Sequence, residues 1–297
     1  MPSYYSHGKL LISSEYAVLD GAKALALPTK FGQRLEVSEK NIKNINWKSF
    51  DCQNNLWFET SISIPYFKPS IANATALRLS QCFQAIHELR PQLFENQKGL
   101  EFVSHLEFPR NWGLGSSSTL INNLAQWAKV DAYKLLALTF GGSGYDIACA
   151  QNPYPITFQK NLKSPKIEKA DFNPPFKDKL FFVHQNQKQD TPMAVAAYQA
   201  LKNTKKLDFS ELNVITNALI QHSTLEVFES LITKHENLIG KLIQQAPLKT
   251  THFCDYNGAI KSLGAWGGDF FLATGTEQQY FKDKGYNTII PFKEMVL

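Results

Sequence analysis

The fold is decided by residues 109–119, which read Pro-Arg-Asn-Trp-Gly-Leu-Gly-Ser-Ser-Ser-Thr. Residues 100–108 read as a strand before this stretch, and apolar residues recur at helical spacing over residues 120–128. Gly113 and Gly115 allow a tight turn and a close approach of the backbone to an anion. The free N–H groups and the positive dipole end of the following helix would point at the same anion. The sequence therefore predicts a phosphate-binding loop between a strand and a helix.

A simpler interpretation competes with this one. Serines are common helix caps, so residues 116–118 are also compatible with an ordinary serine-capped helix after a glycine turn. The stretch is not a Walker loop, because no lysine follows the glycines, and the third glycine of a dinucleotide fingerprint is missing. If the loop binds a nucleotide, the residues that would hold its phosphates are Gly113, Leu114, Gly115, Ser116, Ser117 and Ser118.

Three further segments favour phosphate chemistry. Residues 8–21 read Gly-Lys-Leu-Leu-Ile-Ser-Ser-Glu-Tyr-Ala-Val-Leu-Asp-Gly, and residues 261–269 read Lys-Ser-Leu-Gly-Ala-Trp-Gly-Gly-Asp. Together with the central loop, they resemble the three signature motifs of the GHMP kinases, a family that includes galactokinase, homoserine kinase, mevalonate kinase and phosphomevalonate kinase. Residues 141–148, Gly-Gly-Ser-Gly-Tyr-Asp-Ile-Ala, resemble the stretch that carries the catalytic aspartate in the mevalonate and phosphomevalonate kinases. The resemblance thus points to the isoprenoid branch of the family.

Strand-like and helix-like segments are mixed along the chain, which predicts an α+β protein. A polar stretch with two prolines at residues 171–178 is the best candidate for a linker. Near the C-terminus we predict a helix over residues 255–262 and a strand over residues 270–273. The resemblance implies the two-domain GHMP kinase fold: residues 1–175 would form a nucleotide-binding domain like the second domain of ribosomal protein S5, and residues 176–297 a ferredoxin-like domain.

Asp146 is the predicted catalytic residue. As a carboxylate it would accept the proton of the acceptor hydroxyl or orient that group, which requires the ionised form. Lys9, which resembles the lysine of the first motif, would keep Asp146 ionised and contact the transferring phosphoryl group. The resemblance also implies ATP as cofactor and Mg²⁺ near Ser117. The alternatives are a helix N-cap for Asp146 and a solvated surface side chain for Lys9.

The first and third motifs supply the candidate substrate-binding residues, which are Glu15, Gly264, Ala265, Gly267 and Gly268. Glu15 has a second interpretation, as a salt-bridge partner that organises the first motif. Gly267 and Gly268 are also compatible with a plain turn before a strand. The polar stretch at residues 184–191 resembles a loop that lines the substrate pocket, with Lys188 or Thr191 as the contact.

Several residues depart from the family pattern. Ser14 stands where a glycine is usual, and Leu263 and Trp266 replace small residues. An indole at position 266 would fill part of the pocket or stack on a neighbouring group. Residues 131–140 contain no glutamate, whereas mevalonate kinase carries a Mg²⁺-binding glutamate ahead of its aspartate. Metal binding would then depend on Ser117, the phosphates and water, since Mg²⁺ readily keeps several waters.

Composition bounds the class of protein. The chain has 297 residues, 43% of them hydrophobic, which is enough for two domains with full cores. Its four cysteines lack metal-ligand spacing, and the net charge of +5 comes from dispersed lysines, which argues against a nucleic-acid surface. No apolar run approaches a membrane span and no signal peptide is recognisable, so we expect a cytoplasmic monomer or homodimer that binds a small-molecule substrate.

The predicted function is ATP-dependent transfer of the γ-phosphoryl group to an isoprenoid-pathway alcohol or monophosphate, mevalonate or phosphomevalonate. Two alternatives share the fold. One is the ATP-dependent decarboxylase of diphosphomevalonate, against which the first-motif lysine and the Gly-Ser-Gly-Tyr-Asp stretch argue. The other is a nucleotide- or metabolite-binding regulator with degraded catalysis, against which the retention of Lys9 and Asp146 argues.

Overall fold

The computed structural model describes residues 1–297 except 42, 96–97, 162–163, 190, 203–207 and 222–223. It contains two compact units, and each is built from several segments of the chain. The first unit consists of Met1–Gly8, Phe31–Arg110 and Leu114–Gln151. The second unit consists of Lys9–Lys30, Asn111–Gly113 and Asn152–Leu297.

The sheet of the first unit has the order β4-β3-β5-β2, with β1 also paired to β2. Its strands are β1 (Ser3–Leu11), β2 (Ala24–Lys40), β3 (Asn44–Phe50), β4 (Leu56–Ser63) and β5 (Gly99–Leu106). Strands β3 and β5 are parallel, while β2 runs antiparallel to β5 and β4 antiparallel to β3. Burial alternates strictly along β3, as expected for a sheet with one covered face.

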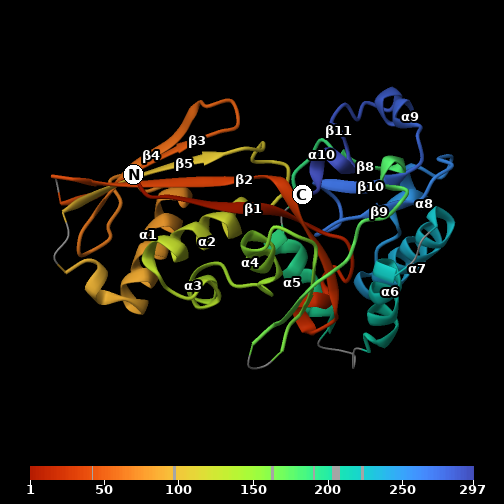
Figure 1. The fold of residues 1–297 in the computed structure, drawn as a ribbon, viewed down its shortest axis with the longest axis horizontal. Helices are drawn as coiled ribbons and strands as arrows, with labels where there is room; N and C mark the ends of the chain where they lie inside the picture. Colours follow the sequence, from red (N-terminus) through yellow and green to blue (C-terminus); the bar gives the residue numbers. More distant parts are fainter. Residues whose placement is uncertain (42, 96–97, 162–163, 190, 203–207, 222–223) are drawn as a thin grey trace. The chain divides into compact units, whose positions relative to one another are not determined.

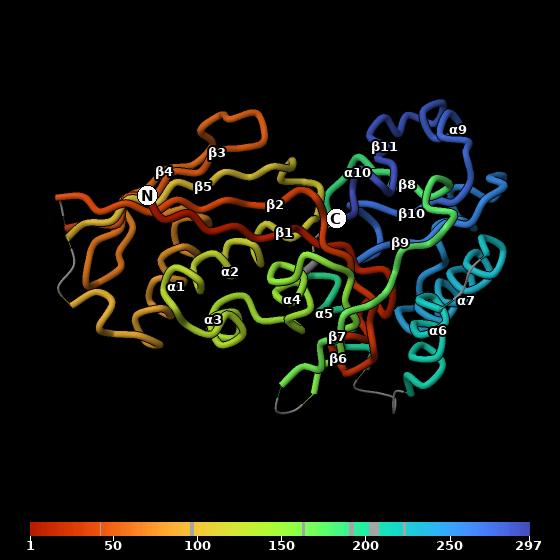
Figure 2. Tube along the Cα trace, viewed as in Figure 1, coloured from red at the N-terminus to blue at the C-terminus, as the bar shows by residue number. Residues whose placement is uncertain are grey.

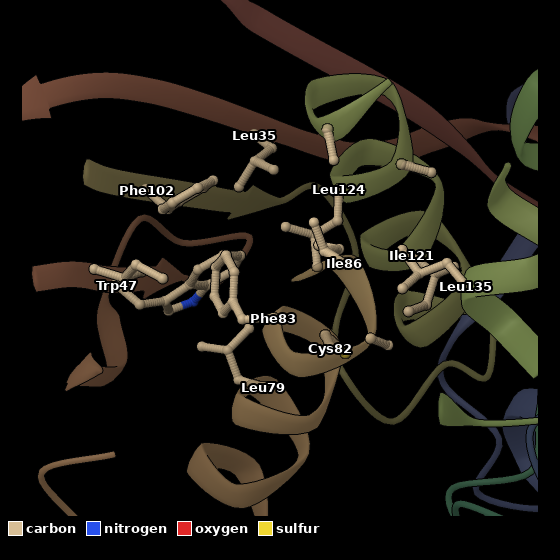
Figure 3. Close-up of a cluster of buried hydrophobic side chains, with 14 of the residues drawn as sticks. Leu35, Trp47, Leu79, Cys82, Phe83, Ile86, Phe102, Ile121, Leu124 and Leu135 are labelled. Carbon is tan, nitrogen blue, oxygen red and sulfur yellow. The ribbon is translucent and has the colours of Figure 1, made fainter. Parts of the chain in front are cut away.

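Helices cover one face of this sheet (Figure 1). They are α1 (Ala74–Leu89), η2 (Pro91–Leu93), α2 (Ser116–Ala128), α3 (Ala132–Thr139) and α4 (Tyr145–Gln151). Helix α1 buries Leu79, Phe83 and Ile86 at the spacing of one helical face. The Phe83 ring meets Trp47 and Phe102 of the sheet edge-on, with ring centroids 6.2 and 5.2 Å apart (Figure 3). This aromatic contact fixes the helical layer on the sheet from which the strand-to-helix loop departs.

The second unit contains a four-stranded antiparallel sheet in the order β11-β8-β10-β9. Its strands are β8 (Leu180–His184), β9 (Ile260–Ser262), β10 (Phe270–Thr274) and β11 (Ile289–Pro291). Every residue of β8 and β10 is buried, so both faces of the sheet are covered. The start of β2 also lies in this unit, where it pairs with β6 (Ile156–Gln159), and β6 pairs in turn with β7 (Lys166–Lys169) (Figure 2).

The longest helices of the second unit lie between β8 and β9 in the sequence. They are η1 (Ala17–Asp20), η3 (Lys177–Lys179), α5 (Thr191–Lys202), α6 (Ser210–Gln221), α7 (Leu225–Ile243), α8 (Leu248–His252), α9 (Gln278–Asp283) and α10 (Phe292–Met295). Within the described residues, no helix is both long and apolar enough to cross a membrane.

The α+β prediction is confirmed, and one predicted element is wrong. Residues 255–262 do not form a helix, and their last part is strand β9, paired with β10. Gly258 gives the physical reason: a β-carbon there would lie 2.1 Å from the carbonyl oxygen of Thr274, so the chain passes directly against the neighbouring strand. The compact units alternate along the sequence, and a domain boundary at residue 175 stays a prediction.

Candidate functional site

Helix α2 begins without a side-chain cap. Its N-cap residue is Gly115, at φ +90°, and no side chain bonds to the N–H groups of the first turn. The hydroxyl of buried Ser118 donates instead to the carbonyl of Gly115, 2.8 Å away. The serine-capped interpretation is therefore wrong, and the first turn keeps the N–H groups that a phosphate would accept.

The serines of this turn differ in exposure. Ser117 is exposed and Ser116 half-buried, while Ser118 is buried and used in the bond to Gly115. Leu114 is buried as well. Ser117 is thus the most exposed of the three serines, and its contact with a phosphate-bound cation stays a prediction. No cluster of three or more metal-binding side chains occurs among the residues that the structure describes.

Asp146 lies in the first turn of α4, in the same unit as α2. Its Oδ1 accepts the N–H of Ile147 at 3.1 Å, and because the helix begins at Tyr145, Asp146 does not occupy the N-cap. The preceding glycines 141, 142 and 144 all have positive φ. The loop therefore needs glycine for its backbone, and Asp146 stands in the first turn directly after it.

Tyr133 borders this loop, and sequence reasoning missed it. A β-carbon at Gly144 would lie 2.9 Å from the Tyr133 ring, so the ring packs directly on the glycine. Burial, reinforced by the negative charge of Asp146, raises the pKa of Tyr133, whose hydroxyl is buried. Tyr133 thus stays neutral at physiological pH and forms part of the wall beside Asp146.

In the second unit, Lys9 and Asp269 meet at Gly113. The ammonium group of Lys9 donates to the Gly113 carbonyl at 2.9 Å. A β-carbon at Gly113 would lie 2.1 Å from Asp269 Oδ2, so the carboxyl group occupies the space of a side chain. Burial raises the pKa of Asp269, opposed chiefly by the charge of Lys9. Gly113 is therefore required by its φ of +66° and by this carboxylate.

Two aromatic contacts and one hydrogen bond hold the segment before Gly113. His184 Nδ1 accepts the N–H of Asn186, so Nε2 carries the proton of the neutral ring and donates to the Asn111 carbonyl at 3.0 Å. Phe270 packs edge-on against Trp112, with centroids 5.3 Å apart, and against His184 at 5.1 Å. Residues of β8 and β10 thus fix the backbone that leads into the predicted phosphate-binding loop.

Alternate glutamines after β8 bind the third-motif loop. Gln185 Nε2 donates to the Gly268 carbonyl at 2.7 Å, and Gln187 Nε2 to the Gly267 carbonyl at 2.6 Å. Gln189 continues the series with a bond to the Trp266 carbonyl. We call these three side chains the glutamine clamp. The stretch 184–191 was predicted to contact substrate through Lys188 or Thr191; Lys188 is exposed, and the Thr191 side chain lies outside the described residues.

The first-motif loop has an unusual backbone. Ser14 and Tyr16 have φ of +63° and +60°, a region that glycine adopts most easily. The Ser14 hydroxyl donates to the Lys23 carbonyl at 2.7 Å, and its N–H donates to His235 Nε2 at 2.8 Å. These bonds explain how a serine stands where the family pattern has glycine.

Glu15 is completely buried in an ionic cluster. The ammonium group of Lys261 donates to Glu15, to Glu236 Oε1 at 3.0 Å and to the Ser262 carbonyl at 2.6 Å. All three ammonium protons are thereby used. Glu236 also accepts the N–H and the hydroxyl of Ser262. The salt-bridge interpretation of Glu15 matches this geometry, which leaves the side chain no exposed surface for a substrate.

Burial and the charge of Lys261 shift the pKa values of the groups in this cluster. Burial raises the pKa of Glu15 to about 7, although Lys261 opposes the shift. Burial also raises the pKa of Glu236 and lowers that of His235 well below its ordinary value. His235 Nε2 accepts the Ser14 N–H, so Nδ1 carries the proton of the neutral ring, 3.7 Å from Glu15 Oε2. The cluster thus holds one cation between two carboxyl groups.

Trp266 is a core residue of the second unit. It is 3% exposed and packs with Tyr16, Tyr198 and Ile239. Its ring approaches Gly240 of α7, where a β-carbon would lie 3.6 Å from it. The backbone N–H of Trp266 donates to the Tyr16 hydroxyl at 3.2 Å. The bulky residue at a family glycine position is therefore accommodated by the interior of the unit.

The remaining third-motif residues differ in access. Gly267 is exposed and Gly264 half-buried, whereas Ala265 and Gly268 are buried. Gly268 lies so close to Gln189 that a β-carbon would be 2.6 Å from the Gln189 nitrogen. Gly264 and Gly267 thus present their backbone to solvent, and contact with a substrate stays a prediction for all four residues.

No protein-family model matches this sequence, and no curated protein matches it. Solved structures do match along nearly its whole length. The mevalonate kinase of Methanococcus jannaschii is 18% identical, with a TM-score of 0.69, and the match covers 97% of this chain and 96% of that one. The phosphomevalonate kinase of Streptococcus pneumoniae, solved with phosphomevalonate and AMPPNP, is 17% identical, with a TM-score of 0.70 and coverage of 97% and 99%.

A mevalonate diphosphate decarboxylase from Legionella pneumophila also matches, at 11% identity and a TM-score of 0.57, over 95% of each chain. These likenesses establish the fold. The chain has the two-domain fold of the GHMP kinases, as its motifs predict.

We predict that Lys261→Met destabilises the protein by about 3–5 kcal/mol at pH 8, because two buried carboxylates lose their cation. The loss should be smaller at pH 5. The pKa of Glu15 is about 7 in the folded state, against an ordinary value of 4.5. Between pH 4.5 and pH 7 the folded protein therefore keeps a proton on Glu15 that the unfolded chain loses, and the contribution of Glu15 to stability falls as the pH rises through this range. Urea unfolding at both pH values measures the effect.

Lys234→Met is the matched control, because its ion pair with Glu211 is exposed. We expect it to change stability by less than about 1 kcal/mol at either pH. Equal losses for the two variants would show that the Lys261 cluster is not buried as described.

Proposed function

We propose that this protein is an ATP-dependent kinase that phosphorylates a small isoprenoid-pathway alcohol or monophosphate, with mevalonate and phosphomevalonate as the first acceptors. The uncapped amino terminus of α2 is the observation that carries the proposal. Its first-turn N–H groups follow a glycine at φ +90° and receive no side-chain cap. A helix start of this kind binds phosphate oxygens through its amides and dipole.

Phosphoryl transfer mainly requires positioning and charge stabilisation. We assign the phosphates of ATP to the backbone from Gly113 to Ser118, and Mg²⁺, which would neutralise phosphate charge, to the exposed Ser117 hydroxyl. Asp146 would orient or deprotonate the acceptor hydroxyl. Lys9 would place its positive charge at Gly113, where its ammonium group already lies. The proximity of Lys9 to Asp146, which belongs to the other compact unit, is part of the proposal.

The acceptor class follows from the Gly-Ser-Gly-Tyr-Asp stretch and from the two kinases with the same fold. Decarboxylation of a diphosphorylated substrate is the competing reaction, because a decarboxylase shares the fold. Retention of Lys9 and Asp146 in the predicted positions supports transfer to an acceptor oxygen instead. Release of CO₂ separates the two reactions experimentally.

Gly115→Ala should weaken ATP binding by at least tenfold, since a β-carbon at φ +90° strains the turn and obstructs close approach of a phosphate. Gly285→Ala is the matched control, because Gly285 has φ +88° and open space around its α-carbon. Calorimetric titration measures the ATP affinity of both variants, and circular dichroism shows whether they are folded. The assignment fails if folded Gly115→Ala binds ATP as the control does.

Asp146→Ala should lower turnover by roughly 10² to 10⁴ fold, the range for loss of a general base, without a matching loss of stability. Asp131→Ala is the contrasting variant, because Asp131 is a true N-cap that accepts the N–H groups of Tyr133 and Lys134. It should lose about 1 kcal/mol of stability and keep its turnover per folded molecule. Single-turnover rates and thermal unfolding on the same preparations test both. Near-normal turnover in Asp146→Ala would exclude a catalytic role.

A further inference from the structure

Asp269 adopts a backbone conformation that most residues avoid. Its φ is +55°, in the left-handed region, directly after Gly267 at +102° and the buried Gly268. Residues kept in such conformations cluster at functional sites, because the surrounding structure must hold them there. Glycine would adopt this backbone without strain, so an aspartate at this position indicates that its side chain has a role.

The surroundings hold Asp269 from several sides. Its N–H donates to the Gln187 carbonyl at 2.9 Å, and its carbonyl accepts the Gln185 N–H at 2.8 Å. Its Oδ1 accepts the Gln189 N–H at 3.3 Å. The glutamine clamp binds the carbonyls of the three residues before it. The position of the Asp269 carboxylate is therefore set by one short segment after β8.

The carboxylate lies where Lys9 acts. It fills the space beside the Gly113 α-carbon, while Lys9 binds the carbonyl of the same glycine at 2.9 Å. The charge of Lys9 is the strongest influence opposing the effect of burial on Asp269. An anion and a cation thus lie on either side of Gly113, which is the first residue of the predicted phosphate-binding loop.

We propose that Asp269 is a positioning residue that holds the Lys9 ammonium group at the Gly113 carbonyl, and thereby places its charge for phosphoryl transfer. Only the role of this charge in phosphoryl transfer rests on the proposed function; the position of the ammonium group does not. Asp269 touches neither reacting atom; it acts through Lys9. The glutamine clamp holds the aspartate in turn, which links the segment after β8 to the start of the phosphate-binding loop.

The test uses Asp269→Asn, which keeps the shape, and Asp269→Gly, which also relieves the backbone. Both should lower kcat by about 100-fold, the cost of misplacing a reacting group by about 1 Å. Asp269→Gly should unfold no more easily than the unsubstituted protein. Gln244→Gly is the control for backbone relief, since Gln244 caps α7 at φ +57°, and it should keep full kcat. Full kcat in Asp269→Gly would overturn the proposal, because activity would then depend on the backbone turn at residue 269 and not on its carboxylate.

A second readout follows Lys9 directly. A neighbouring carboxylate favours the charged amine, so its loss should speed acetylation of Lys9 by an amine-reactive ester about tenfold, measured by mass spectrometry of the intact variants. Lys234, paired with Glu211 on the surface, should react at an unchanged rate. An unchanged Lys9 rate would overturn the charge interaction between the two residues.

Combining the substitutions separates this inference from the proposed function. Lys9→Met with Asp269→Gly should be no slower than Lys9→Met alone, because Asp269 acts only through Lys9. Losses that multiply would contradict that route. Faster Lys9 acetylation in a protein that transfers no phosphoryl group would refute the proposed function and leave the charge interaction between Lys9 and Asp269 supported.

Discussion

The ammonium group of Lys261 joins segments from both ends of the chain. Glu15 comes from the first motif, Glu236 from α7, and Ser262 from the end of β9. A buried charge is tolerable only when paired and fully hydrogen-bonded, so these three segments must stay together. Residues 9–30 consequently pack with the C-terminal sheet in one compact unit. That arrangement brings Lys9 and Asp269 to the same glycine.

Strained backbone occurs in both of the loops that the cluster joins. Ser14, Tyr16 and Asp269 all have positive φ without being glycine. Each is held by hydrogen bonds or packing: Ser14 by Lys23 and His235, Tyr16 by the Trp266 N–H, and Asp269 by the glutamines after β8. Such strain persists only where the surroundings determine the conformation, which is the condition for holding charged groups in fixed positions. The loops therefore combine rigidity with exposed backbone at Gly264 and Gly267.

Features that neighbouring residues determine could be predicted from the sequence, whereas contacts between residues far apart in the chain could not. The glycine loops at 113–115 and 141–144 were recognisable, because positive φ and helix starts leave local signatures. The Lys261 cluster was not recognisable from the sequence, because Glu15 and Lys261 lie more than 200 positions apart. A lysine in a short strand also gives no sign that it is fully buried. Trp266 was expected at the pocket, but its partner Gly240 could not be identified from sequence. The period-two spacing of Gln185, Gln187 and Gln189 was visible, yet only the structure shows which carbonyls they bind.

We propose that this chain transfers a phosphoryl group from ATP to an isoprenoid-pathway acceptor. The most direct measurement incubates the purified protein with ATP and Mg²⁺ plus mevalonate, phosphomevalonate or diphosphomevalonate, and quantifies ADP, inorganic phosphate, phosphorylated product and CO₂ separately. We expect equal amounts of ADP and phosphorylated product with mevalonate or phosphomevalonate, and no CO₂. Release of CO₂ and phosphate from diphosphomevalonate, or no acceptor-dependent ADP at all, would contradict it.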